Sequence, residues 1–235
     1  MIHRFIGAFP LDVKQFWISD GELEHQAREV LRLKPGEEII LSDGKGREAR
    51  AEIISYDRKA MEVKILEVGE GINEPKAKAV LYLAILKREN FELAVQKAVE
   101  AGVSKIVPII TKRTIKLGLK KERLDKIIKE AAEQSGRSVL PELGGELNFK
   151  EAVADAKTNN LNIFFTLGAK PLDAKKDLSG KSVGIFIGPE GGWDKFETES
   201  AKAAKFVLAG LGNLVLRAET AAIIGVYETL RSRVI

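Results

Sequence analysis

Val183-Gly184-Ile185-Phe186-Ile187-Gly188-Pro189-Glu190-Gly191-Gly192-Trp193 has the pattern of an apolar strand that ends in a glycine turn. A second turn of this kind, Gly210-Leu211-Gly212, follows Phe206-Val207-Leu208 and leads into Arg217-Ala218-Glu219-Thr220. Glycine allows a backbone to approach a ligand closely. Open α/β sheets bind ligands beyond the carboxyl ends of their strands. The two turns therefore predict one ligand site at the carboxyl edge of a sheet.

Around these turns, apolar runs alternate with segments of helical periodicity. We predict strands over 79–86, 106–110, 163–167, 183–187 and 206–208, and helices over 91–101, 121–134 and 219–231. A further helix is expected after Asp194, because Asp194 and Glu197 have the spacing of a capping box. Strands that alternate with helices predict a mainly parallel sheet for residues 73–235.

The first 72 residues differ, because they read mostly as β structure. Asp43-Gly44-Lys45-Gly46 is a hairpin signal between two strand-like runs. One short helix is predicted over Glu22–Arg32, and a small barrel fits the rest. Gly69–Pro75 has the composition of a linker. We therefore expect two domains, 1–72 and 73–235.

Several classes of protein are disfavoured by composition. The 235 residues include no cysteine and only two histidines, so neither a disulfide nor a metal site is expected. No apolar run approaches the ~20 residues of a membrane helix. The amino-terminal residues lack the apolar region of a secretory signal. The default expectation is a soluble cytoplasmic protein with no membrane partner.

Positive charge is concentrated in the second predicted domain. Residues 1–72 carry 11 basic and 14 acidic side chains, whereas 73–235 carry 27 and 20. Residues 112–129 alone hold eight lysines and arginines against two acids. Such a local excess suits a nucleic-acid backbone, and a solvated helix face accounts for it equally well.

Each motif also has a purely structural explanation. Gly188–Gly192 works as a tight turn between a strand and a helix, and Arg217–Thr220 as helix capping with a surface ion pair. Glu133–Arg137 works as a helix end. A P-loop and a complete dinucleotide fingerprint are both missing, which argues against an ordinary nucleotide-binding enzyme.

Together and in this order, the motifs resemble one family: the SPOUT-class methyltransferases that modify N3 of a uridine in bacterial small-subunit (16S) ribosomal RNA. The resemblance covers nearly the whole chain. The matching blocks are His3–Ile6, His25–Arg32 with Gly36 and Asp43–Gly46, Gln96–Pro108, Glu133–Arg137, Ile187–Gly192 and Leu211–Ala221. Other SPOUT proteins share the last two blocks in outline. Glu133–Arg137 and the first domain narrow the match to this family.

The resemblance implies an α/β fold in two parts, an amino-terminal PUA-like β-barrel that binds RNA and a carboxyl-terminal SPOUT domain with a deep trefoil knot. The knot is expected from the segments that carry Gly188–Gly192 and Leu211–Thr220. The family acts as a homodimer on ribosomal RNA, which we expect within the assembled small subunit. Its cofactor is S-adenosylmethionine, bent into the knot near the subunit interface.

Site residues follow from family position and agree with the chemistry. The cofactor-binding residues implied are Leu167, Gly188, Pro189, Glu190, Gly191, Leu211, Gly212, Val215 and Leu216. Removal of the N3 proton spreads negative charge onto the uracil carbonyls, which an arginine stabilises. Arg217 is the implied catalytic group, with Arg4 arriving from the barrel to hold RNA or base. No general base is assigned; Glu190, Glu219 and solvent are the candidates.

RNA contacts are implied on both domains. The expected residues are Arg28, Arg32, Lys45, Lys112, Arg113, Gln134 and Arg137. Two positions depart from the family pattern: Lys87-Arg88-Glu89-Asn90-Phe91, where Lys-Gly-Asp is usual, and Leu214, where arginine is common. These departures leave open a SPOUT enzyme that acts on another RNA, such as transfer RNA. A non-catalytic RNA-binding dimer is the other alternative.

Overall fold

A computed structural model describes residues 2–115, 118–172 and 180–231 of the chain. The chain forms two compact units. The first comprises Met1–Glu74 together with Ala132–Leu140, and the second comprises Pro75–Ala131 together with Pro141–Ile235. The sequence suggests a single division at residue 72. It does not predict that residues 132–140 belong to the first unit.

The first unit is built on a five-stranded sheet in the order β1-β3-β4-β5-β2. Its strands are β1 (His3–Ile6), β2 (Gln15–Ile18), β3 (Glu38–Ser42), β4 (Arg47–Asp57) and β5 (Ala60–Glu70). The predicted hairpin is confirmed, because β3 and β4 pair antiparallel around residues 43–46. β1 instead pairs parallel to β3.

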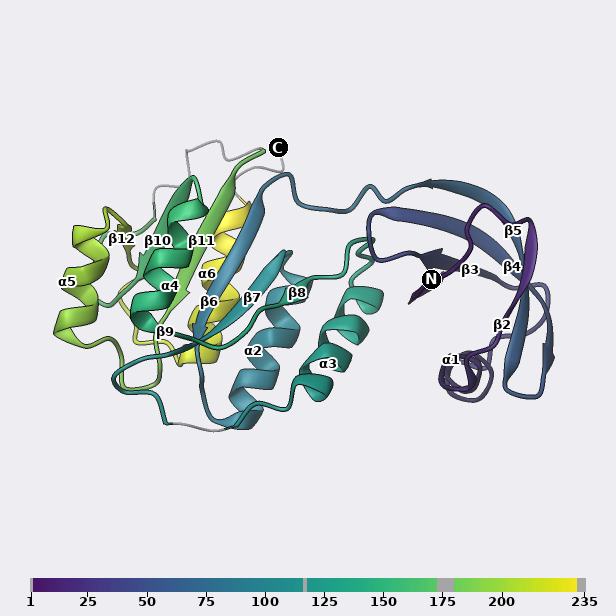
Figure 1. Ribbon diagram of the computed structural model, residues 1–235, viewed down its shortest axis with the longest axis horizontal. Coiled ribbons are helices and arrows are strands. Elements are labelled where there is room, and N and C mark those ends of the chain that lie inside the picture. Colours follow the sequence, from purple (N-terminus) through teal and green to yellow (C-terminus); the bar gives the residue numbers. More distant parts are fainter. Residues whose placement is uncertain (1, 116–117, 173–179, 232–235) are drawn as a thin grey trace. The chain divides into compact units, whose positions relative to one another are not determined.

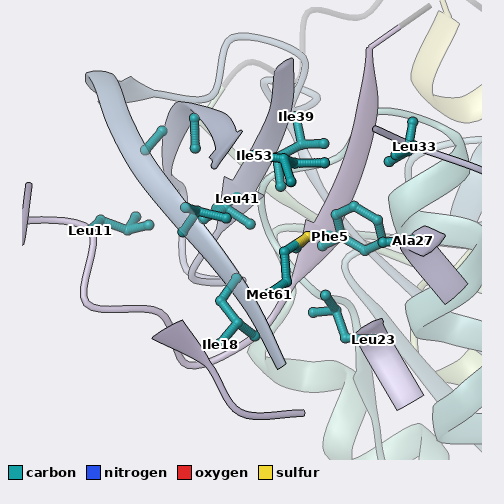
Figure 2. Close-up of a cluster of buried hydrophobic side chains, with 13 residues drawn as sticks. Phe5, Leu11, Ile18, Leu23, Ala27, Leu33, Ile39, Leu41, Ile53 and Met61 are labelled. Carbon is teal, nitrogen blue, oxygen red and sulfur yellow. The ribbon is translucent and has the colours of Figure 1, made fainter. Parts of the chain in front are cut away.

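Apolar side chains of this sheet gather on one buried cluster (Figure 2). Phe5, Ile39 and Met61 are almost completely buried there, and Leu23 and Ala27 join them from the helical segment. That segment is α1 (Gly21–His25), followed without a break by a π-helical turn (Gln26–Val30). The predicted helix over 22–32 is thereby confirmed in outline, although its second half is wound more widely.

The second unit holds a parallel sheet in the order β12-β10-β11-β6-β7-β8, with β9 also paired to β7 (Figure 1). Every pairing in it is parallel, as predicted. Its strands are β6 (Lys78–Ala84), β7 (Lys105–Ile110), β8 (Glu142–Leu143), β9 (Leu147–Asn148), β10 (Leu161–Phe165), β11 (Ser182–Ile187) and β12 (Val207–Ala209). Its helices are α2 (Arg88–Glu100), α3 (Lys121–Gln134), α4 (Phe149–Asp155), α5 (Lys195–Ala203) and α6 (Ala218–Arg231), with a short 3₁₀ turn at Ala156–Thr158. The last residues of α3, from Ala132 on, belong to the first unit.

Helices cover both faces of this sheet. Alternate residues of a strand point to opposite faces, so neighbouring apolar residues pack against different helices. Tyr82, Phe164 and Phe186 pack with Phe149 of α4 and Ala201 of α5. Phe165 and Ile187 face the other way, where a side chain added at Gly225 of α6 would meet both of them. A sheet covered on both faces explains the continuous apolar runs in the sequence.

Short elements escaped the sequence analysis. β1, β2, β8 and β9 have four residues or fewer, too few for a clear alternation. α4 was also missed, although Asn148 and Glu151 form a capping box at its start. The capping box predicted at Asp194 and Glu197 is confirmed. Within the described residues, no helix has the length and apolar character needed to cross a bilayer.

Candidate functional site

A pocket of about 1000 Å³ lies in the second unit, beyond the carboxyl ends of three neighbouring strands. Its wall includes Phe165–Leu167 at the end of β10 and Ile187–Trp193 at the end of β11. After β12 and into α6, the lining residues are Leu211, Gly212, Leu214–Glu219 and Ala221. This is the edge at which open α/β sheets bind ligands. The volume lies at the upper end of the range for small-molecule sites, about 300–1,000 Å³.

Trp193 fixes the first glycine turn to the core. Its indole stacks on Phe164 with the ring centres 4.3 Å apart. Its Nε1 donates a 2.8 Å hydrogen bond to the carbonyl oxygen of Phe165. A Cβ added at Gly188 would lie only 3.0 Å from the indole. Gly188 therefore leaves room for Trp193, and any larger residue there would press against the indole.

A neighbouring loop braces the same turn. Arg113 Nη1 donates a 2.6 Å hydrogen bond to the carbonyl oxygen of Gly191. The backbone amide of Lys112 donates to Glu197 Oε1, and the amide of Asp194 donates to Glu197 Oε2; both hydrogen bonds are 2.8 Å long. Glu197 thus caps α5 and holds the loop at once. Arg113, predicted as an RNA contact, lines the pocket beside the first glycine turn.

The second glycine turn is shaped by a backbone crossing. The amide of Gly210 donates to the carbonyl oxygen of Lys170 over 2.8 Å, and a Cβ there would approach the oxygen of Ala169 to 2.4 Å. Gly212 has φ +109° and nothing within 4 Å of its Cβ position. Leu214 and Val215 are 79% and 78% exposed. The turn therefore presents open backbone and uncovered apolar side chains to the pocket.

Two acidic side chains line the pocket, and they differ in their surroundings. Glu190 is exposed, and its Oε1 accepts a 3.2 Å hydrogen bond from the amide of Lys87 at the start of α2. Glu219 is buried near the start of α6, with its Oε2 lacking any hydrogen-bond partner. The segment that departs from the family pattern thus contacts the pocket through Lys87 and Asn90.

The structure brings the predicted cofactor set together. All nine residues line this pocket, and so does Arg217, which is exposed. Sequence reasoning missed Trp193, Thr198, Lys87 and Asn90 as lining residues. Trp193 adjoins the glycine turn, so its position was a usable signal. Lys87 and Asn90 follow a different strand, and only the sheet order brings them here.

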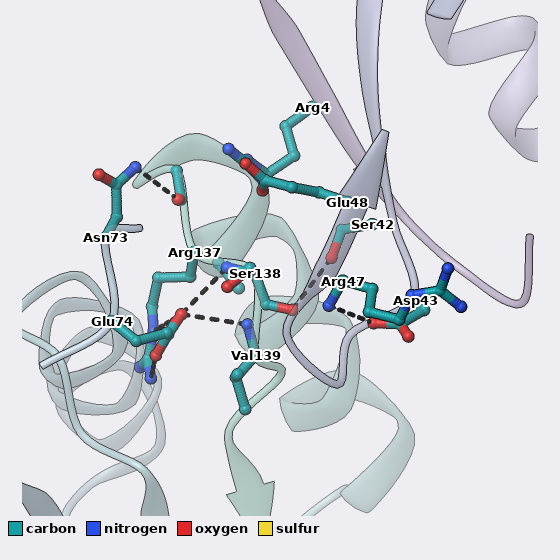
Figure 3. Close-up of polar contacts among 12 residues, drawn as sticks. Arg4, Ser42, Asp43, Arg47, Glu48, Asn73, Glu74, Arg137, Ser138 and Val139 are labelled. Carbon is teal, nitrogen blue, oxygen red and sulfur yellow. Dashed lines mark hydrogen bonds and ion pairs between the residues drawn. The ribbon is translucent and has the colours of Figure 1, made fainter. Parts of the chain in front are cut away.

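The remaining predicted residues belong mostly to the first unit. Arg4 forms an ion pair with Glu48, and its side chain is largely buried (Figure 3). Arg32 and Lys45 are exposed, Arg32 with a positive φ of 57°. Arg28 is half-exposed and pairs with Glu24 and Glu29. Gln134 and, in the second unit, Lys112 are also exposed.

Arg137, predicted as an RNA contact, is buried in an ion pair in this structure. Its side chain is 4% exposed, and its Nη2 donates to Glu74 Oε2 over 2.7 Å (Figure 3). Glu74 Oε1 also accepts hydrogen bonds from the amides of Ser138 and Val139, each 3.0 Å long. A guanidinium held in this way is withdrawn from a phosphate backbone. Its observed role is to tie 132–140 to Glu74, the last residue of the amino-terminal segment of the first unit.

The same contacts set the ionisation of Glu74. Burial by itself raises the pKa of this carboxyl, but the hydrogen bond and charge of Arg137 and the two amides together bring the pKa below its usual range. Glu74 therefore stays ionised around neutral pH.

Among the described residues, no three histidine, cysteine, aspartate or glutamate side chains are grouped as metal ligands.

Comparisons with known proteins agree with this architecture. A family model described as an RNA methyltransferase domain matches residues 73–227, and one described as an RNA methyltransferase PUA domain matches 27–66. The ribosomal RNA small subunit methyltransferase E of Mesomycoplasma hyopneumoniae is 39% identical over 68% of this chain and 72% of its own. That of Rickettsia conorii is 33% identical over 87% and 84%. The crystal structure of the Neisseria gonorrhoeae enzyme bound to S-adenosylmethionine superposes with a TM-score of 0.86, at 31% identity, over 96% and 95%.

The two matched family models, over residues 73–227 and 27–66, define the chain as an RNA methyltransferase with a PUA domain. The chain belongs to the family of ribosomal RNA small subunit methyltransferase E proteins. The predicted fold class, an α/β domain of the SPOUT class preceded by a PUA-like domain, is confirmed.

Proposed function

We propose that this chain transfers a methyl group from S-adenosylmethionine to N3 of a uridine in 16S ribosomal RNA. Membership of the methyltransferase E family supports an RNA substrate. One observation carries the proposal: both glycine turns and Arg217 line a single pocket at the carboxyl edge of the parallel sheet. The reaction takes place where ribosomes are assembled, in the cytoplasm.

The pocket residues suit this cofactor. Open backbone at Gly212 leaves space for a flat ring, since no atom lies within 4 Å of its Cβ position. Leu167 and Val215 offer uncovered apolar side chains for the adenosine. We assign its binding to the nine residues predicted from the sequence. When bound, the cofactor supplies an electrophilic methyl carbon on a sulfonium.

Arg217 is assigned to charge stabilisation. Loss of the N3 proton leaves negative charge on the uracil carbonyl oxygens, and a fixed cation beside them stabilises the transition state. Arg217 is exposed at the pocket wall, where an RNA base has access. Arg4 is retained as a contact to RNA from the first unit, on condition that its pair with Glu48 opens.

RNA binding is assigned to exposed cations on both units: Arg28, Arg32, Lys45, Lys112 and Arg113, with Gln134 as a polar contact. The base edge to be modified is hidden in an A-form duplex, so a looped or single-stranded target is expected.

We further propose that a homodimer acts on the assembled small subunit. The uncovered apolar side chains Leu214 and Val215 at the pocket are consistent with coverage by a second copy or by RNA.

The reaction itself is tested by product analysis. The protein is incubated with isotopically labelled S-adenosylmethionine and either small ribosomal subunits or free 16S RNA, and the nucleosides are identified by mass spectrometry. Labelled 3-methyluridine at one position, with subunits preferred, is the expected result. Label in another nucleoside, or none from either substrate, contradicts the proposal.

Cofactor binding has a separate test with a matched control. Gly212→Ala places a methyl group in the pocket at a positive φ, and calorimetry should show S-adenosylmethionine affinity reduced at least about tenfold. Gly36→Ala carries the same type of strain at φ +89°, also in open space, but outside the pocket. It should bind normally. Equal affinity in both variants would remove the second turn from the cofactor site.

A further inference from the structure

Glu219 is a buried acid with one carboxylate oxygen, Oε2, that has no hydrogen-bond partner. It is the second residue of α6, is 7% exposed and lines the pocket. Among the described residues, two buried side-chain oxygens have no hydrogen-bond partner: Ser138 Oγ and Glu219 Oε2. Only Glu219 lines the pocket. A buried acceptor left unpaired is costly, and at a pocket wall it is placed to accept a hydrogen bond from a ligand.

The other pocket acid is already engaged. Glu190 Oε1 accepts the amide hydrogen of Lys87, and its side chain is exposed. The sequence alone left Glu190, Glu219 and solvent as candidates for the base. Burial and hydrogen bonding now separate the two acids, because Glu190 already accepts a hydrogen bond whereas Glu219 Oε2 has none and is left to accept one from a bound nucleobase.

The charges around Glu219 suit an anionic base. The other charged side chains that line the pocket are Lys87, Arg113, Arg217 and Glu190. The start of α6 adds the positive end of a helix dipole, which favours a carboxylate in the first turn. The Glu219 carboxylate therefore lies in a region with a net excess of cations. The negative charge that develops on the target uracil lies in the same region.

We propose that Glu219 is the catalytic base that takes the N3 proton of the target uracil, an inference that rests on the proposed function. The N3–H bond breaks and its proton passes to the Glu219 carboxylate. The electron pair left on N3 forms the new bond to the methyl carbon. The carbon–sulfur bond breaks with its electron pair retained on sulfur. Arg217 stabilises the charge on the uracil oxygens while this happens.

The division of labour has a consequence for substrate choice. A carboxylate acceptor at this position favours a base that presents an N–H at N3, as uracil does. Cytosine presents an unprotonated N3 instead and has no proton to give. Glu219 thus serves as a specificity-determining residue as well as the base.

The test compares Glu219→Gln with Glu228→Gln, a change of the same type on the same helix outside the pocket. Glu219→Gln should lower the single-turnover methylation rate about 10²–10⁴-fold, the usual contribution of a general base. The wild-type rate should level off at high pH, whereas the rate of the variant should keep rising with hydroxide concentration. Glu228→Gln should match the wild type in both respects.

Two further readouts separate chemistry from structure. Calorimetry should show unchanged S-adenosylmethionine affinity in Glu219→Gln. RNA with 5-fluorouridine at the target has a more acidic N3–H, and it should narrow the gap between variant and wild type at least tenfold. Glu219→Asp guards against a folding defect: it keeps a carboxylate, and should retain the wild-type form of the pH profile at a reduced rate.

Each failure has its own meaning. A wild-type protein that methylates no RNA refutes the proposed function. An active wild type with a Glu219→Gln rate within a fewfold of it refutes Glu219 as base. Loss of cofactor affinity in Glu219→Gln, or the same deficit with 5-fluorouridine as with uridine, also overturns the inference, because the acid would then hold the cofactor or the fold.

Discussion

Glu74 in the first unit and Glu219 in the second are both carboxylates withdrawn from most solvent, and they differ in what surrounds them. Glu74 accepts hydrogen bonds from Arg137 and from two backbone amides. Glu219 has an oxygen with no partner at all and lines a large pocket. A satisfied carboxylate such as Glu74 fixes the groups around it, whereas an unsatisfied one at a pocket wall can still accept a hydrogen bond from a ligand. The contrast predicts that changes at the two sites affect different properties.

The largest effect on stability is expected from Arg137→Met. It leaves Glu74 without its cation, and removal of one partner from a buried pair costs about 3 kcal/mol or more. The chain has two tryptophans, so Trp17 fluorescence in a Trp193→Phe background reports unfolding of the first unit alone. Arg47→Met removes an exposed pair with Asp12, which solvent screens, and should cost far less stability than Arg137→Met. Equal losses from both changes would erase the structural role given to Arg137.

Arg217→Ala should have the opposite profile. Turnover should fall by ~10²-fold or more, because charge on the uracil oxygens loses its cation. Stability and S-adenosylmethionine affinity should stay close to wild type, since Arg217 is exposed. Single-turnover methylation and calorimetry measure the two effects. Arg231→Ala, at the other end of α6, is the control. Near-normal turnover of the Arg217 variant would remove it from the mechanism.

A smaller effect should appear in the pH dependence of stability. The pKa of Glu74 in the folded protein lies below its ordinary value of 4.5, so ionised Glu74 stabilises the fold at neutral pH. That contribution is complete above the unfolded pKa and disappears as the pH falls through the folded one. Chemical unfolding between pH 7 and pH 3 should show wild type losing more stability than Glu74→Gln. Parallel curves would contradict the network drawn around Glu74.

The smallest effect is expected from Leu214→Arg, which restores the residue common in the family. Leu214 is 79% exposed, so stability should not change. RNA affinity should rise a fewfold at low salt, and the salt dependence should steepen by about one phosphate contact. Fluorescence anisotropy over a salt series measures both. Phe196→Arg adds the same charge at another exposed apolar position, outside the pocket, and should give a weaker gain.

Much of the second unit was predictable because its signals are local. Helical periodicity predicted the helix over Lys121–Gln134 with its exact bounds, and the capping box predicted the start of α5. Apolar runs predicted the parallel sheet in outline. The glycine turns indicated the position of the pocket, because both follow strands that end at the same edge. In the first unit, the four-residue strands β1 and β2 carried too little pattern to be found.

The role of individual polar residues was less accessible. Arg137 was expected on the RNA-binding surface because its sequence neighbours resemble a family motif. The structure buries it against Glu74, which is 63 positions away in the chain. Nothing in a local window distinguishes an arginine that meets solvent from one that meets a distant carboxylate. The same limit kept Glu190 and Glu219 indistinguishable.

The sequence by itself determined the class of fold, the two glycine turns and the residue types available for chemistry, since periodicity and backbone freedom are properties of short segments. Only the tertiary structure decided that residues 132–140 return to the first unit, that Trp193 occupies the space left by Gly188, and which pocket acid lacks a partner. Burial and hydrogen-bond satisfaction depend on residues far apart in the chain, and these exist as neighbours only once the chain has folded.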